Sequence, residues 1–237
     1  MSIPRFFFEE KPKNIESLKE DIFRHIKALR LRGGDAIVLF DGKGNESVGI
    51  IKDIGKHEVV WELSSRKFVP PKPCSVAIAC SMPKGKRQAF LIEKLSELGV
   101  ARFIPLISSR TVVRPNSGSI SRLQKIATEG ARQSGQNFVM KVEEPMQFGD
   151  AIEIRDYDLK LFAHPDGACL KEILQKFEKS STTKSILCLV GPEGGFTDKE
   201  IELAAKNSFQ KVTLGGPLLR IETAALMIAA AIDYEFV

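Results

Sequence analysis

Three glycine- and proline-rich segments follow successive apolar runs in the C-terminal half of the chain. They are His164–Gly167, Gly191–Gly195 and Gly215–Pro217, and each comes directly after residues typical of a strand. In open α/β sheets ligands lie beyond the carboxyl ends of the strands, where glycine lets the backbone approach a bound molecule closely. One such segment would be an ordinary strand-to-helix turn. Three in succession predict a ligand cleft.

These segments lack the spacing of the common nucleotide and metal sites. No Gly-x-Gly-x-x-Gly follows a strand and no phosphate-binding Gly-x-x-x-x-Gly-Lys-Ser/Thr occurs, so NAD, ATP or GTP bound in the usual ways is not expected. His25, His57 and His164 are scattered and no Cys-x-x-Cys pair occurs, so no metal is expected either. Thr197 and Glu200 have the spacing of a capping box, which predicts a helix beginning directly after the second segment.

Two charged residues, Arg220 and Glu222, follow the third segment. Arg220 could stabilise negative charge that develops on a substrate, or it could form a structural ion pair with Glu222. Glu222 could serve as a general base, or as a first-turn acid that the helix dipole favours. The residue types alone leave both alternatives open.

The elements that would position these residues alternate between strand and helix after residue 74. Strands are expected at 74–80, 102–107, 159–163, 186–190 and 211–214, with a helix at about 84–98. The first strand is continuously apolar, as in a sheet covered on both faces. This part of the chain therefore predicts a largely parallel α/β sheet. A final helix, 221–232, is apolar almost all round, so it is expected to be buried in the core or at a dimer interface.

The first 69 residues read mainly as short strands. Runs at 35–41, 46–54 and 58–63 are joined by tight turns and predict a small antiparallel sheet or barrel. A helix capped by Asn14 is expected because apolar residues recur at helical spacing: Ile15, Leu18, Ile22, Ile26 and Leu29. The stiff segment 70–73 contains three prolines, so the expected domains are 1–69 and 74–237 with 70–73 as linker.

Composition restricts the class of protein. No apolar run reaches the ~20 residues that span a bilayer, and the N-terminus lacks a signal-peptide pattern, so a cytoplasmic protein is expected. Each cysteine lies in an apolar run, which predicts buried, reduced thiols at Cys74, Cys80, Cys169 and Cys188.

The charge of the chain is distributed unevenly. Residues 83–142 carry 11 Lys/Arg against 3 Asp/Glu, a local charge of +8, whereas 143–237 carry 10 against 16. A basic middle beside an acidic C-terminal part indicates a surface that faces a polyanion. The alternative is a solvated basic face without a ligand.

Two C-terminal motifs resemble a known family. Leu189–Phe196 (LVGPEGGF) and Leu214–Ala224 (LGGPLLRIETA) resemble the signature of the RsmE-type ribosomal RNA uridine N3-methyltransferases, which belong to the knotted SPOUT class. Pro4–Phe6 and His25–Asp35 resemble the N-terminal PUA-like domain of the family, and Lys94–Val100 the start of its catalytic domain. The chain departs from the family at three positions: Gln136 stands where arginine is usual, Met140 where proline is usual and Ile221 where threonine is usual.

The resemblance implies a SPOUT-like knotted parallel-sheet domain after a small PUA-like β-barrel. It implies S-adenosylmethionine as cofactor, a homodimer with the active site at the interface, and a uridine of small-subunit (16S) ribosomal RNA as substrate, with no membrane and no metal. Two alternatives remain: a related SPOUT enzyme that methylates another RNA position, and a non-catalytic RNA-binding protein with the same fold.

Together the resemblance and the loops assign site residues. The expected catalytic residues are Arg220, which would stabilise the uracil anion, and Glu222. Contacts to the cofactor are expected from Ala163, His164, Val190, Gly191, Gly194, Gly195, Leu214, Gly215, Leu218 and Leu219. Contacts to RNA are expected from Arg5, Arg30, Lys84, Lys86, Arg110, Arg114 and Arg132.

Overall fold

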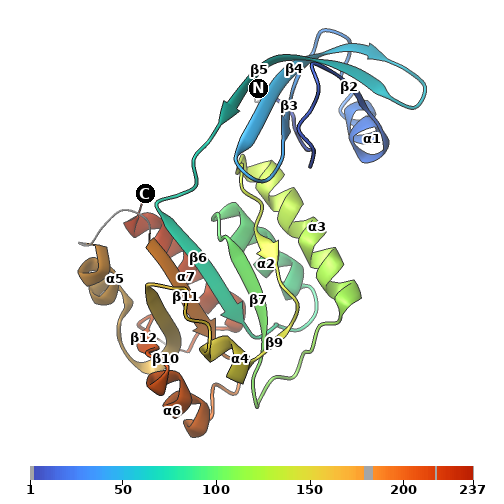
Figure 1. The fold of residues 1–237 in the computed structure, drawn as a ribbon. Helices are drawn as coiled ribbons and strands as arrows, with labels where there is room; N and C mark the ends of the chain where they lie inside the picture. Colours follow the sequence, from blue (N-terminus) through green and yellow to red (C-terminus); the bar gives the residue numbers. More distant parts are fainter. Residues whose placement is uncertain (1–2, 179–183, 217, 237) are drawn as a thin grey trace. The chain divides into compact units, whose positions relative to one another are not determined.

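The computed structural model describes residues 3–178, 184–216 and 218–236. Pro217, the last residue of the third glycine-rich segment, lies outside them. The chain divides into two compact units (Figure 1). Unit 1 comprises residues 1–71 and 132–139, and unit 2 comprises 72–131 and 140–237. This division differs from the expected domains at 132–139, which sequence reasoning assigned to the second domain.

Unit 1 is built on a five-stranded sheet in the order β1-β3-β4-β5-β2. Its elements are β1 Arg5–Phe7, β2 Ile15–Leu18, α1 Glu20–Ala28, β3 Ala36–Phe40, β4 Asn45–Ile54 and β5 Val59–Phe68. The three expected strands are confirmed as β3, β4 and β5, which pair antiparallel in chain order. The β1 strand pairs parallel with β3. Phe6, Ile26 and Trp61 fill the core of the unit.

The expected first helix is wrong in its first turn. Ile15 and Leu18 belong to β2, which pairs antiparallel with β5, and the helix begins only after Lys19, not at Asn14. Two apolar residues three apart fit a helical period, but Leu18 is fully buried through the sheet and Ile15 is exposed. The helix keeps Ile26 as its buried anchor.

The segment 132–139 is part of unit 1 through backbone hydrogen bonds. The Gly44 amide donates to the Asn137 carbonyl at 3.0 Å, and the Val139 amide donates to the Gly42 carbonyl at 3.0 Å. Arg5 donates to the Gln136 carbonyl and to Asn137 Oδ1 at 3.2 and 2.5 Å. The segment therefore adds to the β3–β4 turn of this unit.

Unit 2 contains a parallel sheet in the order β12-β10-β11-β6-β7-β8, with β9 pairing to β7. Its strands are β6 Cys74–Cys80, β7 Arg102–Ile107, β8 Lys141–Val142, β9 Met146–Gln147, β10 Leu159–Cys169, β11 Lys184–Val190 and β12 Gln210–Thr213. Its helices are α2 Arg87–Glu97, α4 Phe148–Ile152, α5 Leu170–Glu178, α6 Asp198–Lys206 and α7 Ile221–Glu235, and α3 Ser117–Ser134 begins in it. The predicted parallel α/β sheet is confirmed.

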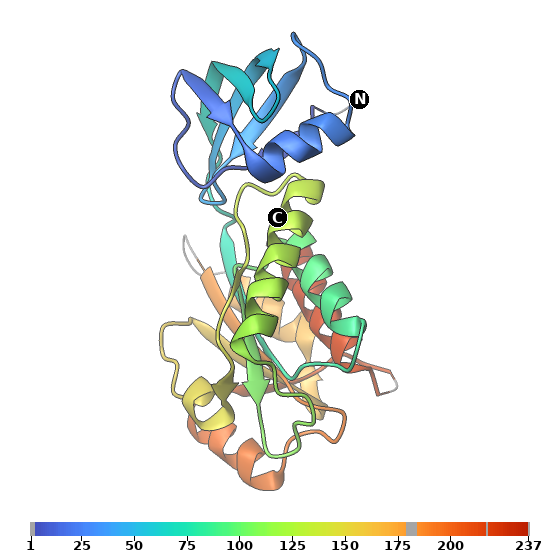
Figure 2. The same cartoon turned by 90° about the vertical axis from the view of Figure 1, so that its right-hand side faces the viewer.

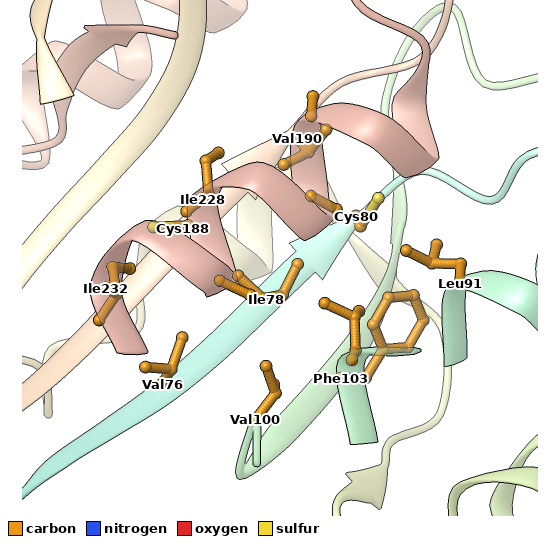
Figure 3. Close-up of a cluster of buried hydrophobic side chains, with 14 of the residues drawn as sticks. Val76, Ile78, Cys80, Leu91, Val100, Phe103, Cys188, Val190, Ile228 and Ile232 are labelled. Atoms are coloured by element: carbon orange, nitrogen blue, oxygen red, sulfur yellow. The ribbon is translucent and has the colours of Figure 1, made fainter. Parts of the chain in front are cut away.

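Helices cover both faces of this sheet (Figure 2). On one face Val76, Ile78 and Cys80 of β6 pack with apolar residues of α2, α3, α5 and α7. Figure 3 shows this cluster between β6 and α7, with Ile228 beside the strand. On the other face Ala77 and Ala79 pack with α4 and α6. The side chains of the apolar β6 strand thus pack into one hydrophobic core on each face of the sheet.

The expected burial of the cysteines is wrong at one position. Cys74, Cys80 and Cys188 are buried, and burial raises the pKa of each thiol, that of Cys74 to about 11. Cys169, the last residue of β10, is exposed after the irregular part of that strand. The α7 helix packs in the core along one face, as expected, whereas Thr223, Met227, Ala230 and Tyr234 are exposed in the single chain, so the expected alternative of a dimer interface stays a prediction.

Candidate active site

The three glycine-rich segments lie at the same edge of the sheet. The strands β12, β10 and β11 are consecutive neighbours and run parallel, so their carboxyl ends stand side by side. Gly195, Gly215 and Gly216 have φ values of +66°, +74° and +71°. No heavy atom lies within 4 Å of the place where a Cβ would stand on any of the three. This open backbone fits a ligand that approaches closely.

The first segment is an excursion within β10, and not a loop after the strand as expected. Ala163 and Ala168 both pair with Val212 of β12, so residues 164–167 leave the sheet and the strand resumes to Cys169. His164 Nδ1 accepts a hydrogen bond from the Asp166 amide at 3.2 Å. A Cβ on Gly167 would stand 2.4 Å from the Val212 carbonyl carbon, so the strand can resume only with glycine there.

The second segment follows β11 and is fixed by side chains. Val190 is buried at the strand end, and a Cβ on Gly191 would lie 3.1 Å from the Phe196 ring. Arg110 Nη1 donates to the Gly194 carbonyl at 2.5 Å. Thr197 and Glu200 form the predicted capping box at the start of α6, which is confirmed.

The third segment leads from β12 into α7. Leu214 and Leu219 are half-buried and pack against the core, whereas Leu218 is 83% exposed. Leu218 therefore presents a large apolar side chain to solvent three residues after the open backbone of Gly215. The segment thus presents apolar surface and bare backbone together, as cofactor sites do.

Arg220 and Glu222 occupy different environments. Arg220 is the exposed N-cap residue of α7, and its carbonyl accepts from the Ala224 amide at 2.9 Å. Glu222 is only 6% exposed, and its Oε1 lies 3.3 Å from Nη1 of Arg87 on α2. The alternative of an ion pair between Arg220 and Glu222 is therefore wrong: the carboxylate pairs with Arg87. Within the described residues, Glu222 Oε2 is buried without a hydrogen-bond partner.

The predicted RNA contacts fall in both units. In unit 2, Lys84, Lys86, Arg110 and Arg114 are exposed, as the prediction requires. In unit 1, Arg30 is exposed, whereas Arg132 is half-buried and donates to the Arg5 carbonyl at 3.3 Å.

Arg5 differs from the other basic residues because its side chain is only 17% exposed. Its Nη1 lies 2.6 Å from Glu46 Oε2. Burial opposes ionisation of Glu46, but hydrogen bonds and charge from Lys67 and Arg5 outweigh it and lower the pKa of that carboxyl. The guanidinium of Arg5 is therefore engaged in holding unit 1 together.

Comparison with known proteins gives the family of the chain. A profile described as RNA methyltransferase domain matches residues 70–233, and one described as RNA methyltransferase PUA domain matches 18–63. The chain belongs to this family of RNA methyltransferases. The expected fold class, a SPOUT-like knotted domain after a PUA-like β domain, is therefore confirmed.

Several relatives of this methyltransferase share one name. Ribosomal RNA small subunit methyltransferase E from Synechocystis is 31% identical over 215 residues, covering 87% of this chain and 68% of the relative. The Bacillus subtilis protein of that name is 29% identical, covering 98% and 96%. A crystal structure of the Neisseria gonorrhoeae protein of that name, bound to S-adenosylmethionine, has a TM-score of 0.89 and 32% identity, covering 98% of each chain.

Sequence reasoning about the methyltransferase missed two features of the site. One is the pairing of Arg87 with Glu222, which joins residues 135 apart in the chain. The second was the contact of Glu200 with Ser109. The capping-box spacing predicted the partner of one carboxylate oxygen of Glu200, but no local pattern indicated that the other oxygen would accept from Ser109.

No group of three or more histidine, cysteine or acidic residues that could hold a metal ion occurs among the described residues. In the same part of the chain, every helix is too short or too polar to cross a membrane.

Proposed function

We propose that this chain transfers a methyl group from S-adenosylmethionine to N3 of a uridine in 16S ribosomal RNA of the small subunit. The observation that carries the proposal is the open glycine backbone that follows β11 and β12, the two strands on either side of β10, in a member of this family. The names of its relatives support the small subunit as substrate. A cytoplasmic location follows from such a substrate.

The proposed cofactor site comprises the three segments at the sheet edge. Bare backbone at Gly195 and Gly215, the apolar side chains of Leu214, Leu218 and Leu219, and the ring of His164 would hold the donor. When bound, S-adenosylmethionine supplies a methyl group that is already activated for transfer. The protein then has to orient the acceptor and help it lose a proton.

We assign Arg220 to the binding of the uracil ring that accepts the methyl group. Uracil N3 is a weak nucleophile while it is protonated, and its anion spreads charge onto the flanking carbonyl oxygens. An exposed guanidinium without an ion pair in the described structure is available to donate to such an oxygen. Arginine remains protonated in proteins, so it stabilises charge and does not act as the base.

Glu222 is less well placed to touch substrate. Both ends of the Arg87–Glu222 contact belong to the helices α2 and α7, and the carboxylate is covered by the core. A direct role as general base would require the segment before α7 to move, whereas a role in fixing the start of α7, and with it Arg220, requires no movement. We propose the second role.

RNA binding is assigned to the exposed basic residues of 83–142. Arg114→Glu and Lys86→Glu are each expected to weaken RNA binding and to make its salt dependence shallower, because each phosphate contact contributes about 0.7 to 0.9 to the slope of log K against log salt. Filter binding of small-subunit RNA at several salt concentrations measures this. Arg155→Glu, on an exposed turn outside the basic segment, is the control. Unchanged slopes in both variants would show that the segment is only a solvated face.

The expected homodimer is assigned to α7. Its exposed residues Thr223, Met227, Ala230 and Tyr234 recur at helical spacing and form one face, with Met227 45% and Tyr234 87% exposed. A second copy of the chain is the occupant that we assign to this face. Met227→Asp is expected to convert a dimer to a monomer in analytical ultracentrifugation, and a monomeric wild type would exclude the assignment.

The test of the proposed function is methylation of small-subunit particles from cells that lack the protein. The purified chain with S-adenosylmethionine is expected to add one methyl group, which mass spectrometry of nuclease fragments locates on a uridine and tandem fragmentation on N3. A methyl group elsewhere would identify a related enzyme with another target. RNA binding without any methylation would identify a non-catalytic RNA-binding protein.

A further inference from the structure

Glu200 of α6 is a buried carboxylate whose two oxygens serve different partners. Oε2 accepts from the amide and hydroxyl of Thr197 at 2.8 and 2.9 Å, which completes the capping box. Oε1 accepts from the amide and hydroxyl of Ser109 at 2.8 and 3.0 Å. Ser109 lies 91 residues away, in the turn that follows β7. A capping box needs only the first oxygen, so the second has another use.

The turn that Glu200 holds is itself closed. The Thr111 amide donates to the Ser108 carbonyl at 3.1 Å, and the Ser108 amide donates to Thr111 Oγ1 at 2.8 Å. Because Ser109 is fixed within this turn by the two hydrogen bonds that it donates to one carboxylate, the backbone of the next residue, Arg110, is fixed as well. The charge strengthens these bonds, as charged acceptors do.

Arg110 extends from this turn across the second glycine-rich segment. Its Nη1 donates to the Gly194 carbonyl at 2.5 Å, and a Cβ on Gly194 would stand 3.2 Å from Arg110 Cδ. The side chain thus packs against bare backbone of the segment 191–196. Gly194 and Arg110 contact each other because β7 and β11 both end at this edge of the sheet.

The ionised state of Glu200 agrees with this arrangement. Burial opposes its charge, but the hydrogen bonds from Thr197 and Ser109 outweigh that effect and lower the pKa of the carboxyl. All four donors face the charged form, so the contact persists at neutral pH.

We propose that Glu200 is a positioning residue for donor binding: it fixes the turn 108–111 so that Arg110 holds the Gly194 carbonyl, which sets the shape of the segment 191–196. This inference rests on the proposed function, in which that segment binds S-adenosylmethionine. It gives Arg110 a role in unit 2 that is independent of RNA.

The experiment is a double-mutant cycle on donor affinity, measured by titration calorimetry without RNA and well below the unfolding temperature. Glu200→Gln places an amide NH₂ group against N–H donors, and is expected to weaken donor binding about tenfold or more. Arg110→Ala is expected to weaken it similarly. The double variant should be no weaker than the weaker single variant, because both act through one contact. Glu202→Gln, an exposed carboxylate on the same helix, is the control and should bind as wild type.

Two results of the binding measurements would overturn the proposal. One is a Glu200→Gln variant that unfolds at a lower temperature but binds the donor normally, which would leave Glu200 as a helix cap only. The other is a double variant whose loss of donor affinity equals the product of the two single losses, which would show that the two residues act independently. Amide hydrogen exchange of residues 191–196 is measured in parallel without ligand. Protection should fall in both single variants, and unchanged protection would also overturn the proposal. If the wild type binds no donor, the proposed function fails, and the exchange data still decide the positioning role.

Discussion

Replacing Arg220 by alanine is expected to lower the rate of methyl transfer by about 100- to 1,000-fold, the usual cost of removing a preorganised donor to developing charge. Donor affinity, RNA affinity and unfolding temperature should stay near wild type. We expect the rate to change without the affinities or the unfolding temperature, because Arg220 is exposed and the carboxylate two residues later pairs with Arg87. No ion pair of the described structure is lost with the side chain.

Single-turnover methylation of small-subunit particles, with donor and RNA saturating, measures the effect of Arg220→Ala. Arg220→Lys keeps the charge but not the planar fork, so it should recover part of the rate at most. Arg155→Ala, on an exposed turn, is the control for loss of a positive charge. A normal rate in Arg220→Ala would remove this residue from the catalytic site.

Gly167→Ala is expected to remove donor binding and to lower the free energy of unfolding by about 1–3 kcal/mol or more, a typical cost of overpacking. The added Cβ would stand 2.4 to 2.6 Å from backbone atoms of Val212 and Thr213. Backbone in a paired strand cannot move aside as the end of a flexible side chain can. The junction at which β10 resumes pairing with β12 would therefore have to separate, and the segment 164–167 would shift with it.

The matched control is Gly149→Ala in α4, where no heavy atom lies within 4 Å of the new Cβ. That variant should be as stable as wild type, or slightly more stable because alanine favours a helix. Urea unfolding and donor titration of both variants provide the measurement. If Gly167→Ala folds and binds the donor as Gly149→Ala does, the close approach at Val212 does not constrain the site.

The sequence predicts β6 and β7 at their observed bounds because both are largely apolar and have the length of a strand. The run 102–107 coincides with β7, and 74–80 coincides with β6, since each is too short for a typical helix and is apolar on both faces. The first helix shows where the same reasoning fails. Ile15 and Leu18 satisfy a helical spacing, and only their pairing with β5, more than 40 residues away, makes them a strand.

The candidate site likewise contains some features that the sequence predicts and others that it does not. The glycine segments and the capping box are local patterns, so their positions could be predicted. The hydrogen-bond and ion-pair partners of the charged side chains could not be predicted. Glu222 pairs with Arg87 and Glu200 with Ser109 through contacts that depend on how distant helices and strands pack. Arg5 gave a further example, because its position near the N-terminus carried no sign that Glu46 and Asn137 would enclose it.

The membership of residues 132–139 in unit 1 has a consequence for dissection of the protein. The covalent chain crosses from one unit to the other at 71/72, again at 131/132 and a third time at 139/140. A protease that cuts the proline segment 70–73 severs only one of these crossings, and the hydrogen bonds that join Gly42, Gly44 and Arg5 to residues 136–139 still retain the fragment. A gene fragment that starts at residue 74 encodes 132–139 without the strands that complete it. Unit 1 is therefore not formed by one continuous stretch of the chain. Recombination could exchange it between proteins only together with the eight residues 132–139, which interrupt the sequence of unit 2.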